Sequence, residues 1–318
     1  MHKLRIVYMG TPDFAVLPLQ RLMEAGHQIV GVVTNPDKPA GRGQKLQESA
    51  VKKYAVAHRL PVLQPERFRD PSFLEQLRSL RADLQFVVAF KMLPEIVWNM
   101  PPFGTVNLHA SLLPDYRGAA PINWAIMNGE HYSGVSTFLL KHEVDTGNII
   151  FQQKVKIDEE MTAGELHDRL MEVGADLLLK TAEAIAEGHY PLTDQTTLLQ
   201  GREPKQAPKI FKEDMKINWS WSVERIYNHI RGLSPFPAAW TELRHKVTGE
   251  VISVKLFKAE RKLLEHNFPV TLDTDGKDFI RIYVKGGYIE VKELQLSGKK
   301  RMTTEAFLRG FRMADYLL

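Results

Sequence analysis

The first 110 residues alternate between short apolar runs and amphipathic segments, and this alternation limits the fold more than any other feature. Apolar runs typical of buried strands occur at residues 4–10, 27–34, 84–90 and 105–109. Residues 13–26 and 70–82, which lie between them, have the pattern of helices. Strands that alternate with helices form parallel sheets covered on both faces. We therefore expect an α/β fold with a Rossmann-like, mostly parallel sheet and helices on both faces.

The pattern changes near residue 190. Residues 191–209 contain few large apolar side chains and are typical of a linker. Beyond them, one helix is expected at 223–232, and several short strand-like runs favour a small barrel of the OB type. The chain therefore divides into a first domain over 1–190, a linker over 191–209 and a β-barrel over 210–318.

Composition excludes several classes of chemistry. The 318 residues include no cysteine, which rules out disulfides, thiolate catalysis and cysteine-based zinc sites and fits a reducing compartment. No run of about 18 apolar residues occurs, and the start of the chain is too weakly apolar for a signal peptide. We expect a cytoplasmic protein with no membrane span.

The charge is distributed unevenly along the chain. Residues 1–200 hold 20 basic and 23 acidic side chains, whereas residues 201–318 hold 22 and 15. This asymmetry is consistent with a polyanionic partner for the C-terminal part. A solvated basic surface explains it equally well, so charge alone leaves both interpretations open.

The common nucleotide and hydrolase motifs do not occur. The first strand-to-helix turn, "MGTPDFA", has one glycine, and its Pro12 removes a backbone donor that a phosphate would use. No P-loop lysine, Gly-x-Ser-x-Gly elbow or histidine pair with zincin spacing is present. His142 and Glu143 are interpreted as polar residues near a strand end rather than as metal ligands.

The segment "NLHASLLPDYRGAAP" places Asn107 and His109 two residues apart in an expected strand. Side chains at this spacing project to the same face, here at the strand end where open α/β sheets bind ligands. An amide donor and a titratable ring can together stabilise an oxyanion and manage a proton. Taken singly, Asn107 is better explained as a helix cap and His109 as a hydrogen-bonded histidine without a catalytic role.

Asp145 stands between two strand-like runs in "HEVDTGNII", followed by Gly147. If it lies near His109, its carboxylate can orient the imidazole ring and raise its basicity. Sequence spacing does not establish that proximity, and Asp145 by itself reads as a turn residue.

Together these motifs resemble a known family. "NLHASLLPDYRGAAP" followed by "VDTG" is similar to the signature of the formyltransferases that depend on 10-formyltetrahydrofolate. "MGTPDFA", "NPDKPAGRGQKL" and "INWSWSVERIYNHIRGLSPFPAAW" extend the resemblance over most of the chain, toward the members that act on methionyl initiator tRNA. The resemblance implies direct attack of the aminoacyl amine on the formyl carbon, through a tetrahedral intermediate.

The resemblance also implies the site residues. It makes Asn107, His109 and Asp145 the catalytic set, with 10-formyltetrahydrofolate as formyl donor and no metal. It implies folate contacts from two loops, "SLLP" and "VAFKMLP". The residues concerned are Ser111, Leu112, Leu113, Pro114, Phe90, Met92 and Leu93.

The resemblance assigns tRNA binding to loop 35–49 and to the basic barrel. The tRNA-binding residues expected on this basis are Lys38, Arg42, Lys45 and Lys209. Without the resemblance, loop 35–49 reads as an ordinary surface loop. Alternative functions are formyl transfer to a sugar-nucleotide amine and RNA binding without catalysis. The expected assembly is a monomer without membrane association.

Overall fold

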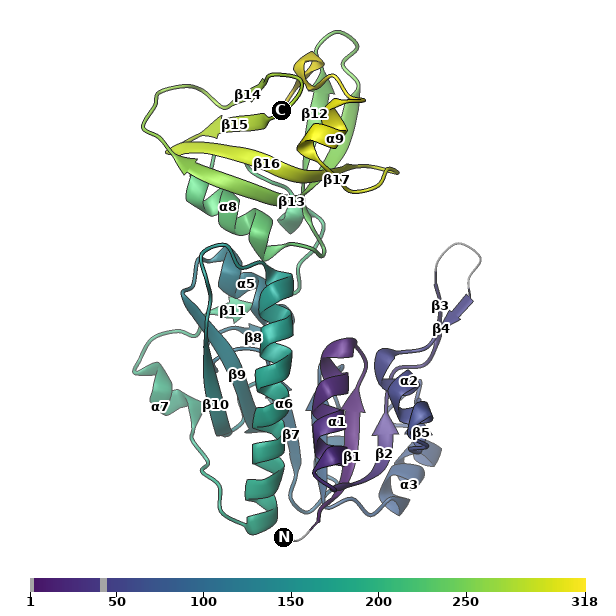
Figure 1. Cartoon of the computed structure of the whole chain (residues 1–318). Helices are drawn as coiled ribbons and strands as arrows, with labels where there is room; N and C mark the ends of the chain where they lie inside the picture. Colours follow the sequence, from purple (N-terminus) through teal and green to yellow (C-terminus); the bar gives the residue numbers. More distant parts are fainter. Residues whose placement is uncertain (1–2, 41–44) are drawn as a thin grey trace. The chain divides into compact units, whose positions relative to one another are not determined.

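The computed structural model describes residues 3–40 and 45–318, which divide into two compact units. The first unit contains Met1–Gly118, Ser133–Lys156 and His167–Ala207. The second contains Ala119–Tyr132, Ile157–Leu166 and Pro208–Leu318. Each unit has its own sheet, and Figure 1 labels their elements.

The first unit is built on a seven-stranded sheet in the order β10-β9-β7-β6-β1-β2-β5. The strands are β1 (Arg5–Gly10), β2 (Gln28–Val33), β5 (Val62–Leu63), β6 (Leu84–Val88), β7 (Thr105–His109), β9 (Tyr132–Leu139) and β10 (Ile149–Lys156). From β5 to β7 all neighbours run parallel, and β9 pairs antiparallel with β7. The expected Rossmann-like, mostly parallel sheet is confirmed.

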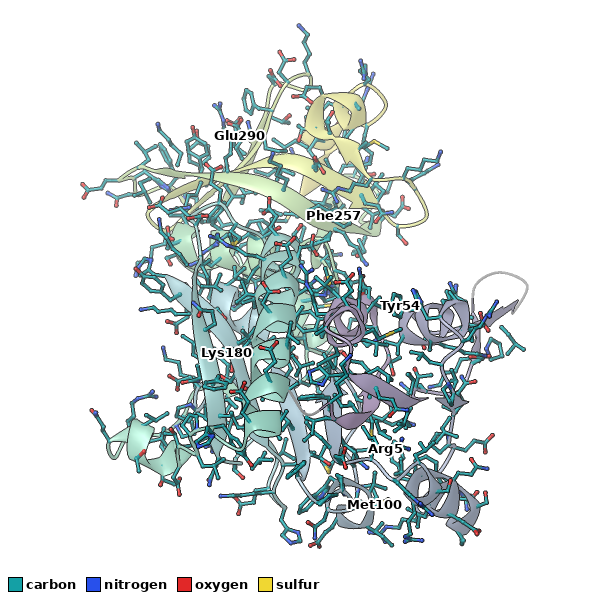
Figure 2. All side chains as sticks on the ribbon, turned by 60° about the horizontal axis from the view of Figure 1, so that its bottom comes forward. Arg5, Tyr54, Met100, Lys180, Phe257 and Glu290 are labelled. Carbon is teal, nitrogen blue, oxygen red and sulfur yellow. The ribbon has the colours of Figure 1, made fainter. Side chains whose placement is uncertain are left out.

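Helices cover both faces of this sheet. The helices of the unit are η1 (Asp13–Ala15), α1 (Val16–Glu24), α2 (Ala50–Ala57), α3 (Pro71–Ser79), α4 (Glu95–Trp98), α7 (Gln195–Leu199) and most of α6 (Ala163–Glu187), whose residues 163–166 are grouped with the second unit. On one face α6 packs over β9, where Thr137 and Thr181 are hydrogen bonded at 2.9 Å, and Lys180 lies over the Phe151 ring of β10 (Figure 2). On the other face, α3 and α4 pack on alternate residues of β1 and β6, such as Val7 and Val87.

No helix within residues 3–40 and 45–318 is both long enough and apolar enough to cross a membrane.

The chain order reverses at the middle of the sheet. The first crossovers lead from β1 outward to β2 and β5, and the chain then returns to place β6 on the other side of β1. A crevice forms outside the carboxyl ends of the strands at such a switch point, and this is where open α/β sheets bind ligands. The carboxyl end of β7, one strand further on, holds His109.

Of residues 191–209, which the sequence suggested as a linker, 191–207 are grouped with the first unit and 208–209 with the second. They contain α7 and the short strand β11 (Gln206–Ala207). β11 pairs parallel with β8 (Arg117–Gly118) in the segment that follows β7. Loop 35–49 contains a small antiparallel pair, β3 (Lys38–Ala40) and β4 (Lys45–Gln47).

The second unit is a near-closed antiparallel barrel in the strand order β14-β15-β16-β13-β12-β18, with β17 beside β16. Its strands are β12 (Ala239–His245), β13 (Val251–Leu263), β14 (Thr271–Thr274), β15 (Ile280–Val284), β16 (Gly287–Leu296), β17 (Met302–Thr303) and β18 (Tyr316–Leu317). Its helices are α5 (Pro121–Met127), η2 (Glu213–Met215), α8 (Val223–Gly232), α9 (Thr304–Leu308) and η3 (Met313–Asp315).

The barrel encloses an apolar core and carries charged pairs outside. Ile226 and Ile230 of α8 pack into this core with Ile289 of β16. Glu290, the next residue of β16, accepts a 2.7 Å hydrogen bond from Arg281 on β15 (Figure 2). The predicted C-terminal barrel is therefore confirmed.

Candidate active site

Asn107 and His109 project to the same face of the first sheet, as the sequence predicted. Leu108 between them packs toward α6, where the missing side chain of Gly174 leaves room for its methyl group. Because successive strand side chains alternate, Asn107 and His109 lie on the opposite face. That face is shared with Val87 and Phe138, the register partners of Asn107 on β6 and β9.

The polar residues at this strand end do not cap the next helix. α5 begins at Pro121 with Ala120 as its N-cap, and no side chain gives it a capping hydrogen bond. Proline at the first helical position needs no acceptor for an amide hydrogen. Asn107 is therefore not the N-cap residue of α5.

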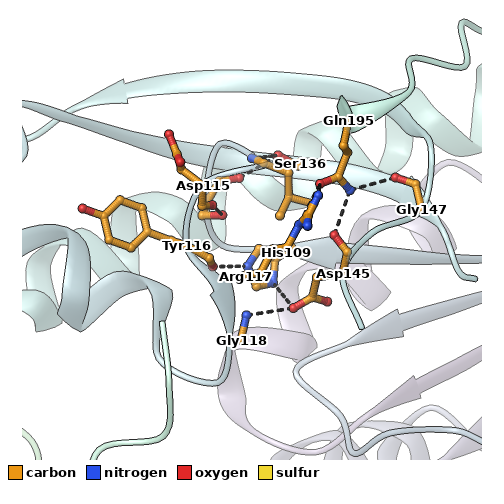
Figure 3. A network of polar contacts seen from close by, with 11 residues as sticks. His109, Asp115, Tyr116, Arg117, Gly118, Ser136, Asp145, Gly147 and Gln195 are labelled. Carbon is orange, nitrogen blue, oxygen red and sulfur yellow. Dashed lines mark hydrogen bonds and ion pairs between the residues drawn. The ribbon is translucent and has the colours of Figure 1, made fainter. Parts of the chain in front are cut away.

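His109 is 8% exposed, and the contacts of its ring define its tautomer. Its Nε2 lies 2.8 Å from the carbonyl oxygen of Tyr116. A carbonyl only accepts, so Nε2 carries the hydrogen and Nδ1 is the atom that can gain or lose a proton. Nδ1 faces Oδ2 of Asp145 at 3.9 Å (Figure 3). This distance exceeds a direct hydrogen bond, and Nδ1 can donate to the carboxylate only when it carries a proton, so the Asp145 carboxylate stabilises the protonated ring.

Asp145 is held rigidly in an unusual backbone conformation. Its φ is +56°, in the left-handed region that costs free energy for residues other than glycine. Its Oδ2 accepts a 2.9 Å hydrogen bond from the amide of Gly118, and the residue is 8% exposed. Two residues later Gly147 passes so close to Leu139 that a Cβ there would lie 1.6 Å from the Leu139 carbonyl oxygen. The "DTG" motif is thus a tight turn that presents a carboxylate to His109.

One short segment orients both members of this pair. The carbonyl of Tyr116 accepts from His109, and the amide of Gly118 donates to Asp145. Gln195 of α7 donates to the backbone carbonyls of Asp145 and Gly147, each at 2.8 Å. Sequence reasoning missed Gln195, because its nearest partner in this network lies 48 positions away and no local motif marks it.

The first expected folate loop, residues 111–114, is largely buried. Ser111 is 1% exposed, and its hydroxyl donates to the carbonyl of Asp115 at 2.7 Å. Leu113 is 2% exposed and Pro114 is also buried, whereas Leu112 is half-buried. The side chains of Ser111 and Leu113 thus hold the turn in place.

The second expected folate loop, residues 89–94, follows β6 and is more open. Met92 is 76% exposed, whereas Leu93 is 8% exposed and belongs to the core between the sheet and α3. Phe90 is half-buried, and its ring centroid lies 5.8 Å from that of Phe68. This loop therefore presents one large apolar side chain to solvent close to the switch point.

The expected tRNA-binding residues fall in different places. Lys38 is exposed on β3, and Lys45 begins β4. Arg42 lies outside the described residues. Lys209 is exposed in the second unit, with Nζ 5.6 Å from the centroid of the exposed Phe211 ring.

The described part of the chain, residues 3–40 and 45–318, contains no cluster of three or more histidine, aspartate or glutamate side chains that could hold a metal ion.

Comparison with known proteins places these features in one family. The formyl transferase model matches residues 3–182, and the model of the formyl transferase C-terminal domain matches residues 209–312. A methionyl-tRNA formyltransferase from Bacteroides fragilis is 53% identical over 313 residues, 98% of this chain and 96% of that protein. One from Parabacteroides distasonis is 54% identical over 317 residues, 98% of each chain.

Solved structures share the fold at lower identity. An N-formyltransferase from Helicobacter canadensis, crystallised with folinic acid and dTDP-3-aminofucose, superposes with a TM-score of 0.67 at 20% identity. The match covers 94% of this chain and all of that one. With two family models covering most of its length and relatives above 50% identity, this chain belongs to the formyl transferase family.

Proposed function

We propose that this protein transfers a formyl group from 10-formyltetrahydrofolate to the amino group of methionyl initiator tRNA. The observation that carries the proposal is the buried His109–Asp145 pair, with Asn107 on the same face of the strand. The methionyl-tRNA formyltransferases described above match this chain over nearly its whole length, including the basic C-terminal part. These two facts together favour an active tRNA enzyme over an inactive RNA-binding protein.

The residues match the chemistry of formyl transfer. The amine attacks the formyl carbon, and a negative charge develops on the formyl oxygen. The amide of Asn107 can donate a hydrogen bond to that oxygen. The amine must lose a proton as it becomes an amide, and Nδ1 of neutral His109 can accept it because Asp145 stabilises the resulting imidazolium, whose positive charge also stabilises the oxygen anion. The tetrahedral intermediate then collapses: the bond between the formyl carbon and N10 of the folate breaks, and the imidazolium returns its proton to that nitrogen.

The loop at residues 89–94 fits a folate. A pterin ring needs an apolar surface on its faces and hydrogen-bonding groups at its edge. Met92 supplies an exposed apolar side chain, and the irregular backbone on either side of it lies beyond the end of β6. In this proposal the buried loop 111–114 contributes backbone groups and the shape of the folate site, and Leu112 is its more accessible side chain.

The β3–β4 hairpin is proposed to contact the tRNA. It presents the exposed Lys38 and Leu46. Its base is fixed by Asp37, whose carboxylate pairs with Lys52 of α2 and accepts from Gln64 at 2.8 Å. The hydrogen bond from Lys52 is the main cause that lowers the pKa of Asp37, so the carboxylate is charged at neutral pH and keeps this anchor intact.

The discriminating experiment offers the protein a labelled formyl donor and two acceptors. Formyl-labelled 10-formyltetrahydrofolate is incubated with methionyl initiator tRNA or with a sugar nucleotide that carries a primary amine. We expect label in N-formylmethionyl-tRNA and none in the sugar. Transfer to the sugar but not to the tRNA would overturn the substrate assignment, and transfer to neither would overturn the proposed activity. Asn107→Ala protein serves as the control for transfer at this site.

A further inference from the structure

The segment after α6, residues 193–207, is hydrogen bonded to the parts of the chain that hold the catalytic pair. We call this segment the strap. At its start, Thr193 and Ile149 exchange two backbone hydrogen bonds of 2.9 Å. At its end, β11 pairs with Arg117 and Gly118, and the carbonyl of Lys205 accepts a 2.6 Å hydrogen bond from the amide of Tyr116. The strap thus binds both the turn that carries Asp145 and the segment that orients His109.

Gln195 is the point where these two parts of the site are joined. Its side chain is among the least accessible polar groups of the unit, at 1% exposure. Its amide nitrogen donates to the carbonyls of Asp145 and Gly147, while its amide oxygen accepts from Arg117 at 3.1 and 2.7 Å (Figure 3). Both donors and the acceptor of one side chain are therefore used inside the site.

We propose that Gln195 is a positioning residue that fixes the distance and direction between Asp145 and His109. The contacts support this role because Arg117 immediately precedes Gly118, whose amide binds the Asp145 carboxylate. Gln195 therefore holds the backbone of Asp145 and, through Arg117, the donor that orients its side chain. The proposal rests on the proposed function in so far as the pair is catalytic.

The physical reason lies in the strained turn at Asp145. A residue with φ of +56° persists only where its surroundings hold it there. Gln195 supplies two of the hydrogen bonds that do so, and losing them leaves two buried carbonyls to find other partners. Displacements of about 1 Å in a catalytic group can reduce the rate about 100-fold, so a relaxed turn is expected to cost turnover rather than substrate binding.

The test compares Gln195→Ala with two control variants in the full-length protein. Gln206→Ala removes the same kind of side chain from an exposed site in the same strap, where its amide nitrogen donates a 3.3 Å hydrogen bond to the carbonyl of Pro204. Thr181→Val removes a buried hydrogen-bonding group at the interface of α6 and β9 and serves as a control for destabilisation alone. All are assayed well below their unfolding temperatures.

We expect Gln195→Ala to lower kcat about 10- to 100-fold with KM for both substrates within about twofold of wild type. Both controls should keep kcat within about threefold of wild type. In the Asp145→Ala background, Gln195→Ala should cost less than about twofold more, because it acts through Asp145. Three results would each overturn the proposal. These are wild-type kcat in Gln195→Ala, a loss of kcat in Thr181→Val equal to that in Gln195→Ala, and an undiminished loss of about 10- to 100-fold when Gln195→Ala is added to Asp145→Ala.

A second measurement does not depend on activity. The Gly118 amide hydrogen that binds Asp145 should exchange with solvent about tenfold faster in Gln195→Ala than in wild type or Gln206→Ala, as measured by NMR. Unchanged exchange would overturn the positioning role even if the protein proved to transfer no formyl group. Faster exchange together with an inactive wild type would instead refute the proposed function and leave the positioning role standing.

Discussion

Two connections leave the carboxyl edge of the same sheet and are held in opposite ways. The connection after β7, residues 110–120, is bound along its length to the strap and to β9. Ser136, for example, donates to the carbonyl of Ser111 at 2.6 Å and accepts from the amide of Leu113 at 3.1 Å. The connection after β2, residues 35–49, is anchored at its base by Asp37 and its partners, while Lys38 and Leu46 in its two strands are exposed.

This difference matches the roles that we propose for the two connections. Proton transfer and oxyanion stabilisation depend on distances of a few tenths of an ångström, so the groups around His109 need fixed partners. Capture of a large polyanion depends mainly on charge and reach, which exposed side chains on a small hairpin provide. The comparison therefore predicts steep losses for changes after β7 and shallower losses for changes in the hairpin.

The largest effect is expected at the proposed catalytic pair, His109 and Asp145. His109→Ala and Asp145→Ala should each lower kcat by roughly 10²–10⁴, the usual contribution of a positioned acid or base. The double variant should be little worse than either single variant, because the two side chains act as a unit. Single-turnover formylation assays measure both quantities, and fully multiplicative losses would contradict the coupling.

Asn107→Ala should have the next largest effect. Removal of one oxyanion donor costs roughly 10²–10³ in turnover, and binding of tRNA should be unchanged because the lost bond forms only as charge develops. Rapid-quench kinetics and filter binding test the two halves of this statement. Turnover within threefold of wild type would remove Asn107 from the mechanism.

The prediction for loop 35–49 is smaller and concerns substrate capture. Arg42→Ala should reduce formylation of initiator methionyl-tRNA about tenfold, which corresponds to about 1.4 kcal/mol of transition-state binding. A guanidinium pairs with phosphates or base edges through two bonds, so Arg42→Lys should recover only part of the loss. Binding of formyl-folate should not change.

Lys53→Ala is the matched control for the hairpin, since it removes an exposed cation of α2 outside loop 35–49. If Arg42→Ala and Lys53→Ala formylate equally well, the hairpin is an ordinary surface feature.

The smallest effect concerns the ion pair between Asp115 and Arg202, which ties the strap to the connection after β7. Partial burial opposes ionisation of Asp115, but hydrogen bonds from Arg202 and the Lys205 amide, with the nearby positive charges, outweigh it and lower its pKa. Because Arg202 is half exposed and solvent screens its charge, Arg202→Ala should reduce the free energy of unfolding at pH 7 only slightly.

The pH dependence of this pair has a definite sign. A carboxyl whose folded pKa lies below its unfolded value stabilises the fold above the unfolded pKa and loses that contribution as the pH falls through the folded pKa. The stability difference between wild type and Arg202→Ala should therefore be constant above about pH 5 and shrink below about pH 4. Urea titrations across this range measure it, and a difference that grows in acid would contradict the assignment.

The sequence by itself determined the elements and the chemistry of single positions. Hydrophobic periodicity predicted β7 and α8 with their observed bounds, because burial on one or two faces leaves a local pattern. The two-residue spacing of Asn107 and His109 predicted their shared face for the same reason. The close spacing of the short strand-like runs after residue 210 likewise predicted a small barrel.

Only the tertiary structure decided which distant residues meet. It brought Asp145 within 3.9 Å of His109 and placed the Tyr116 carbonyl where it selects the tautomer of that histidine. It also joined Gln195 to Arg117, 78 positions away in the sequence. Residues 193–207 have the composition of a linker but form a strap, because their backbone groups pair with Ile149, Tyr116 and β8 rather than with close neighbours in sequence. Such contacts depend on backbone hydrogen bonds, which every residue except proline can donate, so composition carries no trace of them.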